Sequence, residues 1–453
     1  MFVINKQTIR NVLSLALPAV GEMILYMLIW VFDTMMVGQY GGNLTVTAVG
    51  LSSEIIYTCV NILISVGIAI GTTSLVARKV GAKEYHQAEE YATLGTLVTV
   101  VIALVLSFVF FTFSKQILTF TKANTEVVSI GSKYMQICSI GIFFSMLTST
   151  LNGVLRGYGN TKTPLVASII VNLVNISLDW LLIFGHFGLP ELGTKGAAIA
   201  TTTANILGFL FIATFTYKSS ELKPRVKYIK EFNINELKEM LKLSIPSSLQ
   251  EGAFSINRLI NTFMIVSLGN IAFSANQITT TIESLSFMPG WGFAVAATTL
   301  VGHKIGEKNI KKAKEYANTC LVLGAGIMGI CSLLFLLFPN FLINLFINES
   351  EVEVIRLGAI CLMIASIEQI PMGVSMIIGG SLKGSGDTKS PFIVSVISNW
   401  FIRLPLMYYF IFIRKTPVTY VWTITAIQWG FDAVLIYIIY KRKFKQENSL
   451  LAL

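Results

Sequence analysis

The sequence predicts an all-α polytopic membrane protein whose twelve transmembrane helices form two six-helix halves. Three observations predict this class: the composition, the spacing of the apolar runs and an internal repeat. Hydrophobic residues make up 54% of the 453 residues and charged residues only 13%, and the mean hydropathy is +0.70. A soluble domain usually carries about 25% charged residues. The composition therefore places the chain among membrane proteins.

Apolar runs that end at charges, glycine or proline mark the twelve spans. Each run is long enough to cross a bilayer, for which about 20 apolar residues suffice. We place the spans near residues 12–38, 47–76, 91–114, 127–154, 163–185, 196–217, 242–268, 272–301, 316–338, 353–382, 391–413 and 418–440. An even number of spans puts both ends of the chain on the same side of the membrane.

The positions of the lysines and arginines test this division, because short cytoplasmic loops carry an excess of positive charge. Of the 34 basic residues, 25 fall in the N-terminal segment, the even-numbered loops and the C-terminal tail. Seven fall on the opposite side and at its span ends, and Arg258 and Arg403 lie deeper within spans. We therefore expect a plasma-membrane protein with cytoplasmic termini. The net charge of +10 follows from this loop pattern, and no basic domain remains that would bind nucleic acid.

The two halves of the chain repeat each other. Three segments recur in the same order at nearly the same offset: LALPAVGEM at 15–23 with LSIPSSLQE at 243–251, VARKVGAKEYHQAEEYA at 76–92 with VGHKIGEKNIKKAKEYA at 301–317, and LRGYGNTKTP at 155–164 with LKGSGDTKSP at 382–391. Six spans per repeat insert both halves in the same orientation. Transporters built in this way place their substrate site between the halves.

A charged segment after the sixth span separates the halves. It covers residues 218–240 and contains Pro224. We predict an N-lobe at 1–217, a cytoplasmic linker at 218–240 that serves as a tether, and a C-lobe at 241–453.

Carboxylates occur inside the predicted spans, where a charged side chain costs about 3 kcal/mol on insertion scales. Eight of the 24 acids lie there beyond the first residue of a span: Glu22, Asp33, Glu54, Asp179, Glu251, Glu283, Glu368 and Asp432. Only Arg258 and Arg403 oppose them within the spans, and Arg258 can pair with Glu251 on one helix face. Several acids are therefore expected to take a proton or a metal cation from outside, which is the physical basis of cation coupling.

The first span carries two of these acids. Glu22 and Asp33 lie three turns apart and nearly on one helix face, in a helix that also contains Pro18. An acid at this depth normally faces a cavity and marks a proton or ion path. For Glu22 a paired helix contact is an equally weighted alternative.

The fifth span carries Asn172, Asn175 and Asp179 at i, i+3 and i+7, so they share one face. Two amides and a carboxylate offer several oxygens to a cation or a proton. Bridging between helices is the structural alternative for the asparagines.

Comparison of the two halves shows that the second half does not keep all of these polar residues. Asn172 corresponds to Asn399, but Asp179 corresponds to Leu406 and Asp33 to Asn261. The first half is thus the better candidate for a coupling site. Acids of the second half stay as secondary candidates, together with Asn172: Glu251, Glu283 and Glu368.

The sequence lacks the motifs of several other functional classes. The duplicated GYGNTKTP and GSGDTKSP segments do not contain GxxxxGK[ST] and are interpreted as tight cytoplasmic turns. Without a nucleotide-binding motif we expect no ATP dependence. No GxSxG or HExxH occurs, which weighs against a hydrolase. We expect no cofactor and no enzymatic activity.

These features together resemble the multidrug and toxic compound extrusion (MATE) family. The residues that carry the resemblance are ALPAVGEM and VFDTMMVG of the first span, the two duplicated turns, NISLD of the fifth span and GAAIAT at 196–201. The similarity covers essentially the whole chain. It implies twelve helices in two pseudo-symmetric six-helix lobes around a central cavity. It also implies export of cationic, amphipathic compounds in exchange for H⁺ or Na⁺.

The resemblance assigns roles to single residues. Asp33 matches the first-helix acid that the family uses in coupling. Four further residues match its N-lobe proton or cation site: Tyr134, Asn175, Asp179 and Thr201. Asp33, Asn175 and Asp179 are the candidate Na⁺ ligands, and Pro18 matches a proline proposed to let the first helix bend.

Two alternatives to antiport stay open. A lipid-linked precursor flippase has the same helix count, but it is expected to use a cationic cavity. A membrane scaffold or receptor would leave the intramembrane acids without a use. We expect a monomer, because the two-lobe design needs no partner chain.

Overall fold

The computed structural model describes residues 5–225, 227–230, 233–347 and 350–450. Within these ranges the chain is helical and contains no β-strand. The first half comprises α1 (Lys6–Val60), η1 (Asn61–Ile68), α2 (Ala69–Gly81), α3 (Tyr85–Phe120), α4 (Thr125–Tyr158), α5 (Lys162–Phe184), η2 (His186–Gly188), α6 (Thr194–Lys218) and α7 (Lys227–Lys230). The predicted all-α class is confirmed.

The second half comprises α8 (Ile234–Val266), α9 (Asn270–Gly306), α10 (Ile310–Leu337), α11 (Pro339–Asn344), α12 (Val352–Gly384), α13 (Lys389–Val396), η3 (Ile397–Arg403), α14 (Leu404–Tyr408), η4 (Tyr409–Ile413) and α15 (Thr419–Leu450). The segments η1, η3 and η4 are π-helical. Segments of that kind are frequently found at functional sites.

Eleven helices of the described residues are long and apolar enough to cross a membrane. The one predicted span that is missing from these eleven is the seventh, 242–268, which lies in α8, a helix of 33 residues that carries Glu251 and Arg258 among several amides. The first two spans run together as α1. They are separated by a kink at Gly42, whose φ of 64° lies in the left-handed region that glycine adopts at little cost.

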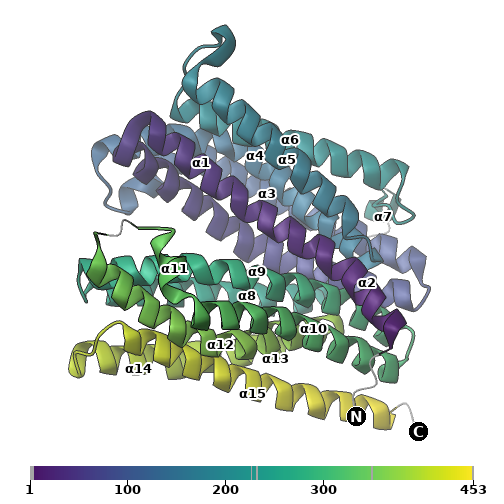
Figure 1. Cartoon of the computed structure of the whole chain (residues 1–453). Coiled ribbons are helices and arrows are strands. Elements are labelled where there is room, and N and C mark those ends of the chain that lie inside the picture. The colour runs from purple at the N-terminus through teal and green to yellow at the C-terminus, as the bar shows by residue number, and fades with distance from the viewer. Residues whose placement is uncertain (1–4, 226, 231–232, 348–349, 451–453) are drawn as a thin grey trace. The chain divides into compact units, whose positions relative to one another are not determined.

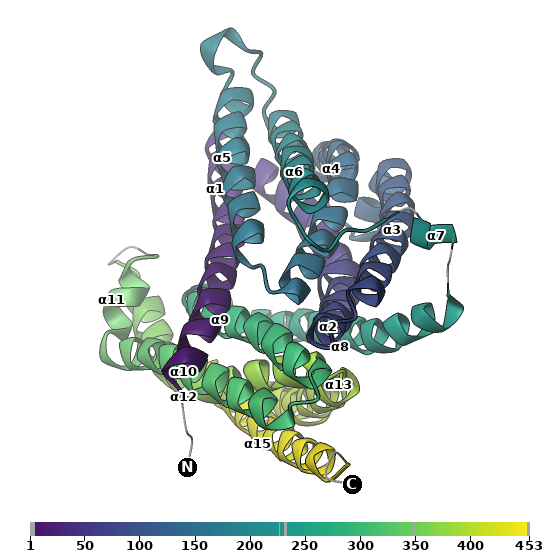
Figure 2. The ribbon, with the colours of Figure 1, turned by 90° about the vertical axis from the view of Figure 1, so that its right-hand side faces the viewer.

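The chain divides into two compact units, of which the first in sequence is Gly21–Ser248. Within it α4 packs against α2, α3 and α6, and α5 packs against α6 (Figure 1). The connection between α5 and α6 extends beyond the ends of these helices (Figure 2). Buried apolar side chains such as Ile64, Met135 and Met146 fill the space between the helices.

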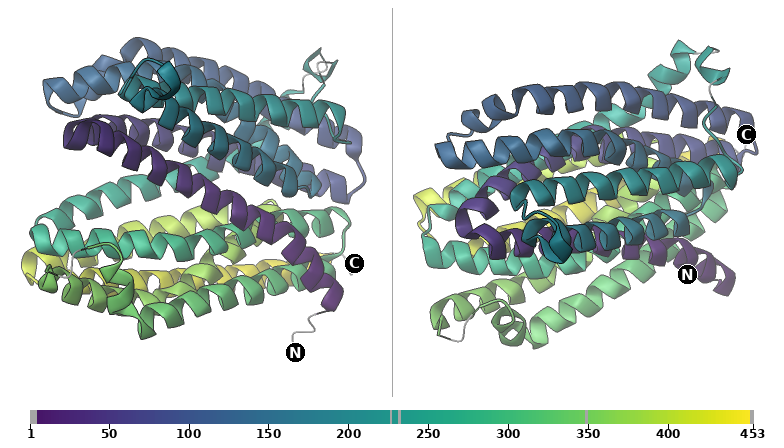
Figure 3. Two further views of the ribbon diagram at one scale, coloured as in Figure 1. Left: turned by 45° about the horizontal axis from the view of Figure 1, so that its top comes forward. Right: turned by 90° about the horizontal axis from the view of Figure 1, so that it is seen from above.

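The other unit contains Leu249–Leu453 together with Met1–Val20. Here α12 packs against α9, α10 and α15, and α13 packs against α15. These green and yellow helices run side by side (Figure 3). The order of contacts reproduces that of the first unit, with α9, α10, α12, α13 and α15 in the places of α2, α3, α4, α5 and α6. The sequence repeat is therefore also a repeat of helix packing.

The limits of the units run through helices. One falls between Val20 and Gly21 in α1, and the other between Ser248 and Leu249 in α8. The two limits are separated by the same 228 residues that relate Pro18 to Pro246. The predicted lobes, 1–217 and 241–453, thus differ from the units in the first parts of these two helices. The lobes as separately moving bodies stay a prediction.

The described residues of the predicted linker, 218–240, belong to the Gly21–Ser248 unit and contact α3. Glu89 of α3 accepts hydrogen bonds from the Arg225 guanidinium at 3.0 Å and the Tyr228 hydroxyl at 3.0 Å. Tyr91 donates to Glu239 at 2.5 Å. Specific polar contacts therefore hold the described part of the linker to α3, and its role as a tether stays a prediction.

Candidate cation site

The α5 helix presents two asparagines and an aspartate to the interior of the Gly21–Ser248 unit. Asn172, Asn175 and Asp179 are 5%, 1% and 0% exposed, and they belong to the few buried positions of this helix. The shared face expected from their spacing therefore exists and is buried.

Asp33 of α1 meets this face. Its carboxylate lies within side-chain hydrogen-bonding contact of Asp179, Asn175 and Thr201. The Asn175 amide in turn donates to the Thr201 hydroxyl at 3.4 Å. Three helices, α1, α5 and α6, thus bring together four residues that are up to 168 positions apart in the chain.

The α4 helix closes the site with Tyr134. This side chain is 3% exposed, and its hydroxyl accepts a hydrogen bond from Ser53 at 3.3 Å. Cys138 lies one turn further along α4, in contact with Tyr134 and near both carboxylates. The sequence analysis did not select Ser53 or Cys138. For Cys138 the spacing of four from Tyr134 was the available signal.

The site contains more hydrogen-bond acceptors than donors. Oδ1 of Asp33, both carboxylate oxygens of Asp179 and Oδ1 of Asn175 are buried without a hydrogen-bond donor. Two carboxylates can bond each other only when one carries a proton. No lysine or arginine contributes to the electrostatics of either acid within the described residues. A proton or a small cation therefore fits these residues.

Asn172 lies outside this contact set. Its amide donates to the backbone carbonyl of Ser168 at 2.8 Å, and its Oδ1 is buried without a partner. It shares the buried face of α5 with the site, but the structure gives it no contact with Asp33 or Asp179.

Glu22, the other acid of the first span, forms an ion pair. Its carboxylate bonds to the Arg156 guanidinium, and Asn152 donates to it at 3.4 Å. Glu22 is 4% exposed and lies four residues after Pro18, which is inside α1 as expected. Of the two alternatives weighed for Glu22, the structure shows the paired helix contact.

The second half repeats this pair. Lys383 corresponds to Arg156 in the duplicated turn, and it interacts electrostatically with Glu251 of α8. Glu251 is half-buried, whereas Arg258 is exposed. Basic residues of the two turns therefore reach acids inside the spans, which corrects the expectation that only the two arginines within spans oppose them.

The other secondary candidates meet each other in the Leu249–Leu453 unit. Glu283 of α9 contacts Glu368 of α12, and the Arg403 guanidinium of η3 faces both carboxylates. Glu368 is fully buried. This cluster carries its own cation, unlike the pair formed by Asp33 and Asp179.

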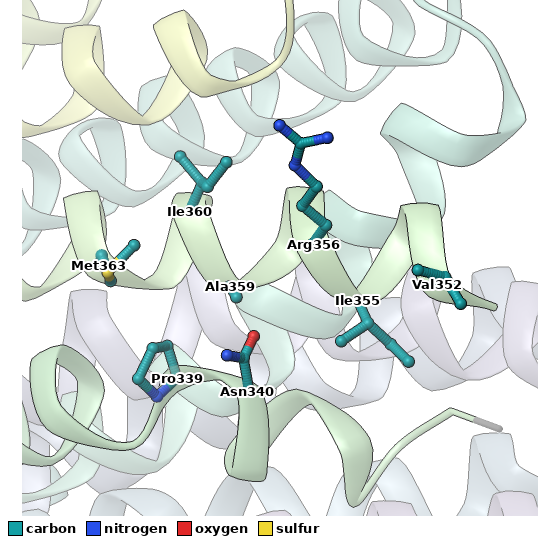
Figure 4. A pocket seen from close by; sticks show the side chains of 8 residues that line it. All are labelled: Pro339, Asn340, Val352, Ile355, Arg356, Ala359, Ile360 and Met363. Carbon is teal, nitrogen blue, oxygen red and sulfur yellow. The ribbon is translucent and has the colours of Figure 1, made fainter. Parts of the chain in front are cut away.

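A cavity of about 480 Å³ lies elsewhere in the same unit. Its lining comes from α11 and the first turns of α12 (Figure 4): Pro339, Asn340, Val352, Ile355, Arg356, Ala359, Ile360 and Met363. None of these residues is a predicted site residue.

Comparison with protein families gives one description for both halves of the chain. The sequence model of the MatE family matches residues 18–181 and again residues 246–409. The two matches are offset by 228 residues, in agreement with the internal repeat. Together they cover more than half of the chain.

Curated relatives include transporters of similar length. The chain is 29% identical over 399 residues to "Probable multidrug resistance protein NorM" of Thermotoga maritima, covering 88% of this chain and 85% of that protein. It is also 29% identical over 400 residues to "Uncharacterized transporter YisQ" of Bacillus subtilis, covering 88% and 87%.

Solved structures share the fold. One, described as "Crystal structure of MATE in complex with MaL6", has a TM-score of 0.91 at 20% identity and covers 98% of this chain and 97% of that chain. Another, described as an outward-facing conformation of a multidrug resistance MATE family transporter, has a TM-score of 0.88 at 21% identity and covers 98% and 99%. This chain is a multi-pass membrane protein and belongs to the MatE family of transporters.

Proposed function

We propose that this transporter exports amphipathic cationic compounds in exchange for H⁺ or Na⁺ bound at Asp33 and Asp179. The observation that carries the proposal is the meeting of these two carboxylates without a basic partner in the described residues. Their buried oxygens lack donors, so an external cation stabilises the site when it binds. The names of the relatives, which include multidrug resistance proteins, support the choice of substrate class.

Cation binding can drive export without direct contact between the cation and the substrate. A substrate that prefers the conformation with an empty cation site is released when a cation fills that site, because the population then shifts to the other conformation. Asn175, Thr201 and Tyr134 orient the carboxylates in this scheme. Pro18 is the point at which α1 bends.

Reconstituted proteoliposomes with an imposed Na⁺ or pH gradient test the proposal. We expect a fluorescent cationic dye to move against one of the two gradients, and the gradient that drives it identifies the coupling ion. Asp33→Asn and Asp179→Asn should each reduce this movement strongly, to a small residual rate, while the protein still reaches the membrane. Glu84→Gln, a change in an exposed loop acid, is the matched control and should transport normally.

Two outcomes would overturn antiport. Normal dye movement in both Asp variants would remove these acids from the coupling. Failure of the unaltered protein to move dye under either gradient would favour a lipid-linked precursor flippase or a non-transporting scaffold. We also propose a monomer in the plasma membrane, with cytoplasmic termini as expected from the distribution of basic residues.

A further inference from the structure

Asp432 of α15 is a buried acid to which the proposed transport cycle gives no role. It is 4% exposed, and its Oδ1 is buried without a hydrogen-bond donor. No lysine or arginine contributes to its electrostatics among the described residues. It differs in this from Glu22, Glu251, Glu283 and Glu368, which all have a basic side chain beside them.

Side-chain oxygens from three helices surround this carboxylate. The Ser375 hydroxyl of α12 donates to its Oδ2 at 3.1 Å, and Ser398 of η3 lies within hydrogen-bonding contact. Gln428 lies one turn before Asp432 on α15, and its amide nitrogen donates to Ser398 at 3.4 Å. Its Oε1 is buried without a partner. All three neighbours are at most 8% exposed.

The helices that supply these groups are the counterparts of those that build the site around Asp33. α12, η3 and α15 take the places of α4, α5 and α6, which contribute Tyr134, Asp179 and Thr201. Ser398 and Gln428 thus come from helices whose counterparts carry site residues in the first half. Ser398 also lies in a π-helical segment, a local geometry that is frequently found at functional sites.

We propose that Asp432, with Ser375, Ser398 and Gln428, forms a Na⁺ site inside the Leu249–Leu453 unit. A hard cation prefers oxygen ligands, and the hydroxyl groups can rotate to turn a lone pair toward it. One carboxylate balances one positive charge, whereas a divalent cation would leave a net charge in the membrane, at high cost. The site is separate from the cluster of Glu283, Glu368 and Arg403.

Thermal unfolding of the purified protein in detergent tests this site without any transport measurement. NaCl replaces choline chloride at constant ionic strength and pH 8. The background is the double variant Asp33→Asn/Asp179→Asn, so that Na⁺ binding there does not contribute. We expect a saturable rise in Tm of about 2 °C or more, because a ligand that binds only the folded state stabilises it.

Two further variants locate the effect. Asp432→Asn in the same background should remove the Na⁺-dependent rise. Ser375→Ala, which takes away a single oxygen, should move the midpoint about fivefold or more toward higher Na⁺ concentration. Ser381→Ala is the matched control, because this buried serine of α12 bonds only to its own helix, and it should leave the midpoint unchanged.

The results separate the possible occupants. A Na⁺-dependent rise that persists in Asp432→Asn, or a midpoint unaffected by Ser375→Ala, would overturn the assignment. The absence of any rise in the background variant would also overturn it and would leave a proton as the counter-charge of Asp432. If Asp432→Asn does not fold, the Ser375→Ala midpoint still decides. Because the readout is binding, loss of antiport in the liposome assay would not affect this result.

Discussion

Glu22 near the start of α1 is bonded to Arg156 at the end of α4, 134 residues later in the chain. The two side chains are 6% and 16% exposed. Asn152 supplies a second donor to the same carboxylate oxygen. The pair fixes α1 to α4 immediately beyond Gly21, where the Gly21–Ser248 unit begins.

Arg156→Ala is expected to destabilise the protein strongly. Removal of one partner of a buried pair leaves an uncompensated charge, which costs about 3–5 kcal/mol. Glu22→Gln should cost less, because the amide oxygen still accepts from Arg156. The measurement is the Tm of each variant in detergent. Lys79→Ala, which breaks an exposed pair with Glu84 at 2.8 Å, is the control and should change stability by about 1 kcal/mol or less. Equal losses in the Arg156 and Lys79 variants would contradict a buried role.

Asp33 and Asp179 are expected to act as one unit in transport. If both carboxylates hold the same cation, the second substitution removes nothing that the first has left. The variants Asp33→Asn, Asp179→Asn and the double variant should therefore show similar residual transport, with a strongly non-additive double-mutant cycle. Initial rates of dye movement in liposomes provide the numbers. Independent, additive losses would show that the two acids serve separate sites.

Glu89 is expected to control the access of proteases to the linker. Its carboxylate receives both Nε and Nη2 of Arg225, at 2.9 and 3.0 Å, and the Tyr228 hydroxyl. Glu89→Ala should release this segment, so that trypsin cleaves faster after Arg225. Limited proteolysis of inside-out vesicles measures the rate. Glu84→Ala serves as the control, and an equal acceleration in both variants would argue against a specific attachment.

The stability of the protein is expected to depend on pH through Asp387, which lies in the second duplicated turn. Burial raises the pKa of Asp387, but the backbone N–H of Ser390 and the ammonium of Lys443 outweigh it, so this pKa lies below the usual range. The group therefore contributes stability above about pH 4, its unfolded pKa, and this contribution is lost as the pH falls through the lowered pKa.

The first duplicated turn shows how Asp387→Asn should behave. There the equivalent Asn160 accepts from the Thr163 backbone N–H at 3.0 Å, as Asp387 accepts from that of Ser390 at 3.0 Å. An amide thus preserves the turn and removes only the Lys443 pair at 3.2 Å. We expect a loss of about 1 kcal/mol or less at pH 7, which disappears at acidic pH. Thermal unfolding from pH 7 to pH 3 measures it, and a loss that is independent of pH would contradict the ion pair.

Much of the fold could be predicted from the sequence because its determinants are local. Apolar runs of bilayer length specify helices, since every backbone polar group in lipid must be bonded within its own segment. The duplicated turns indicated the repeat, and the structure confirms it as a repeated order of helix contacts. The i, i+3, i+7 spacing placed Asn172, Asn175 and Asp179 on one face of α5, and all three are buried.

The partners of the buried acids could not be predicted in the same way. Periodicity says which side of a helix a residue occupies, but not which other helix covers that side. From their spacing, Glu22 and Asp33 were expected to lie nearly on one face of the first helix. In the folded chain Glu22 meets Arg156 and Asp33 meets Asp179. For Glu251 the sequence offered only the local candidate Arg258, and the structure adds Lys383, 132 residues away, as a basic neighbour.

The sequence by itself determined the membrane class, the duplicated six-span plan and the set of acids within the spans. These follow from hydropathy, from charge placement and from segments that recur along the chain. Only the tertiary structure decided which acids have a basic partner and which do not, because that depends on contacts between helices distant in sequence. Packing of the helices leaves Asp33 with Asp179 and leaves Asp432 among neutral oxygens. These acids, which have no basic side chain beside them, are the places where an external cation is expected to bind.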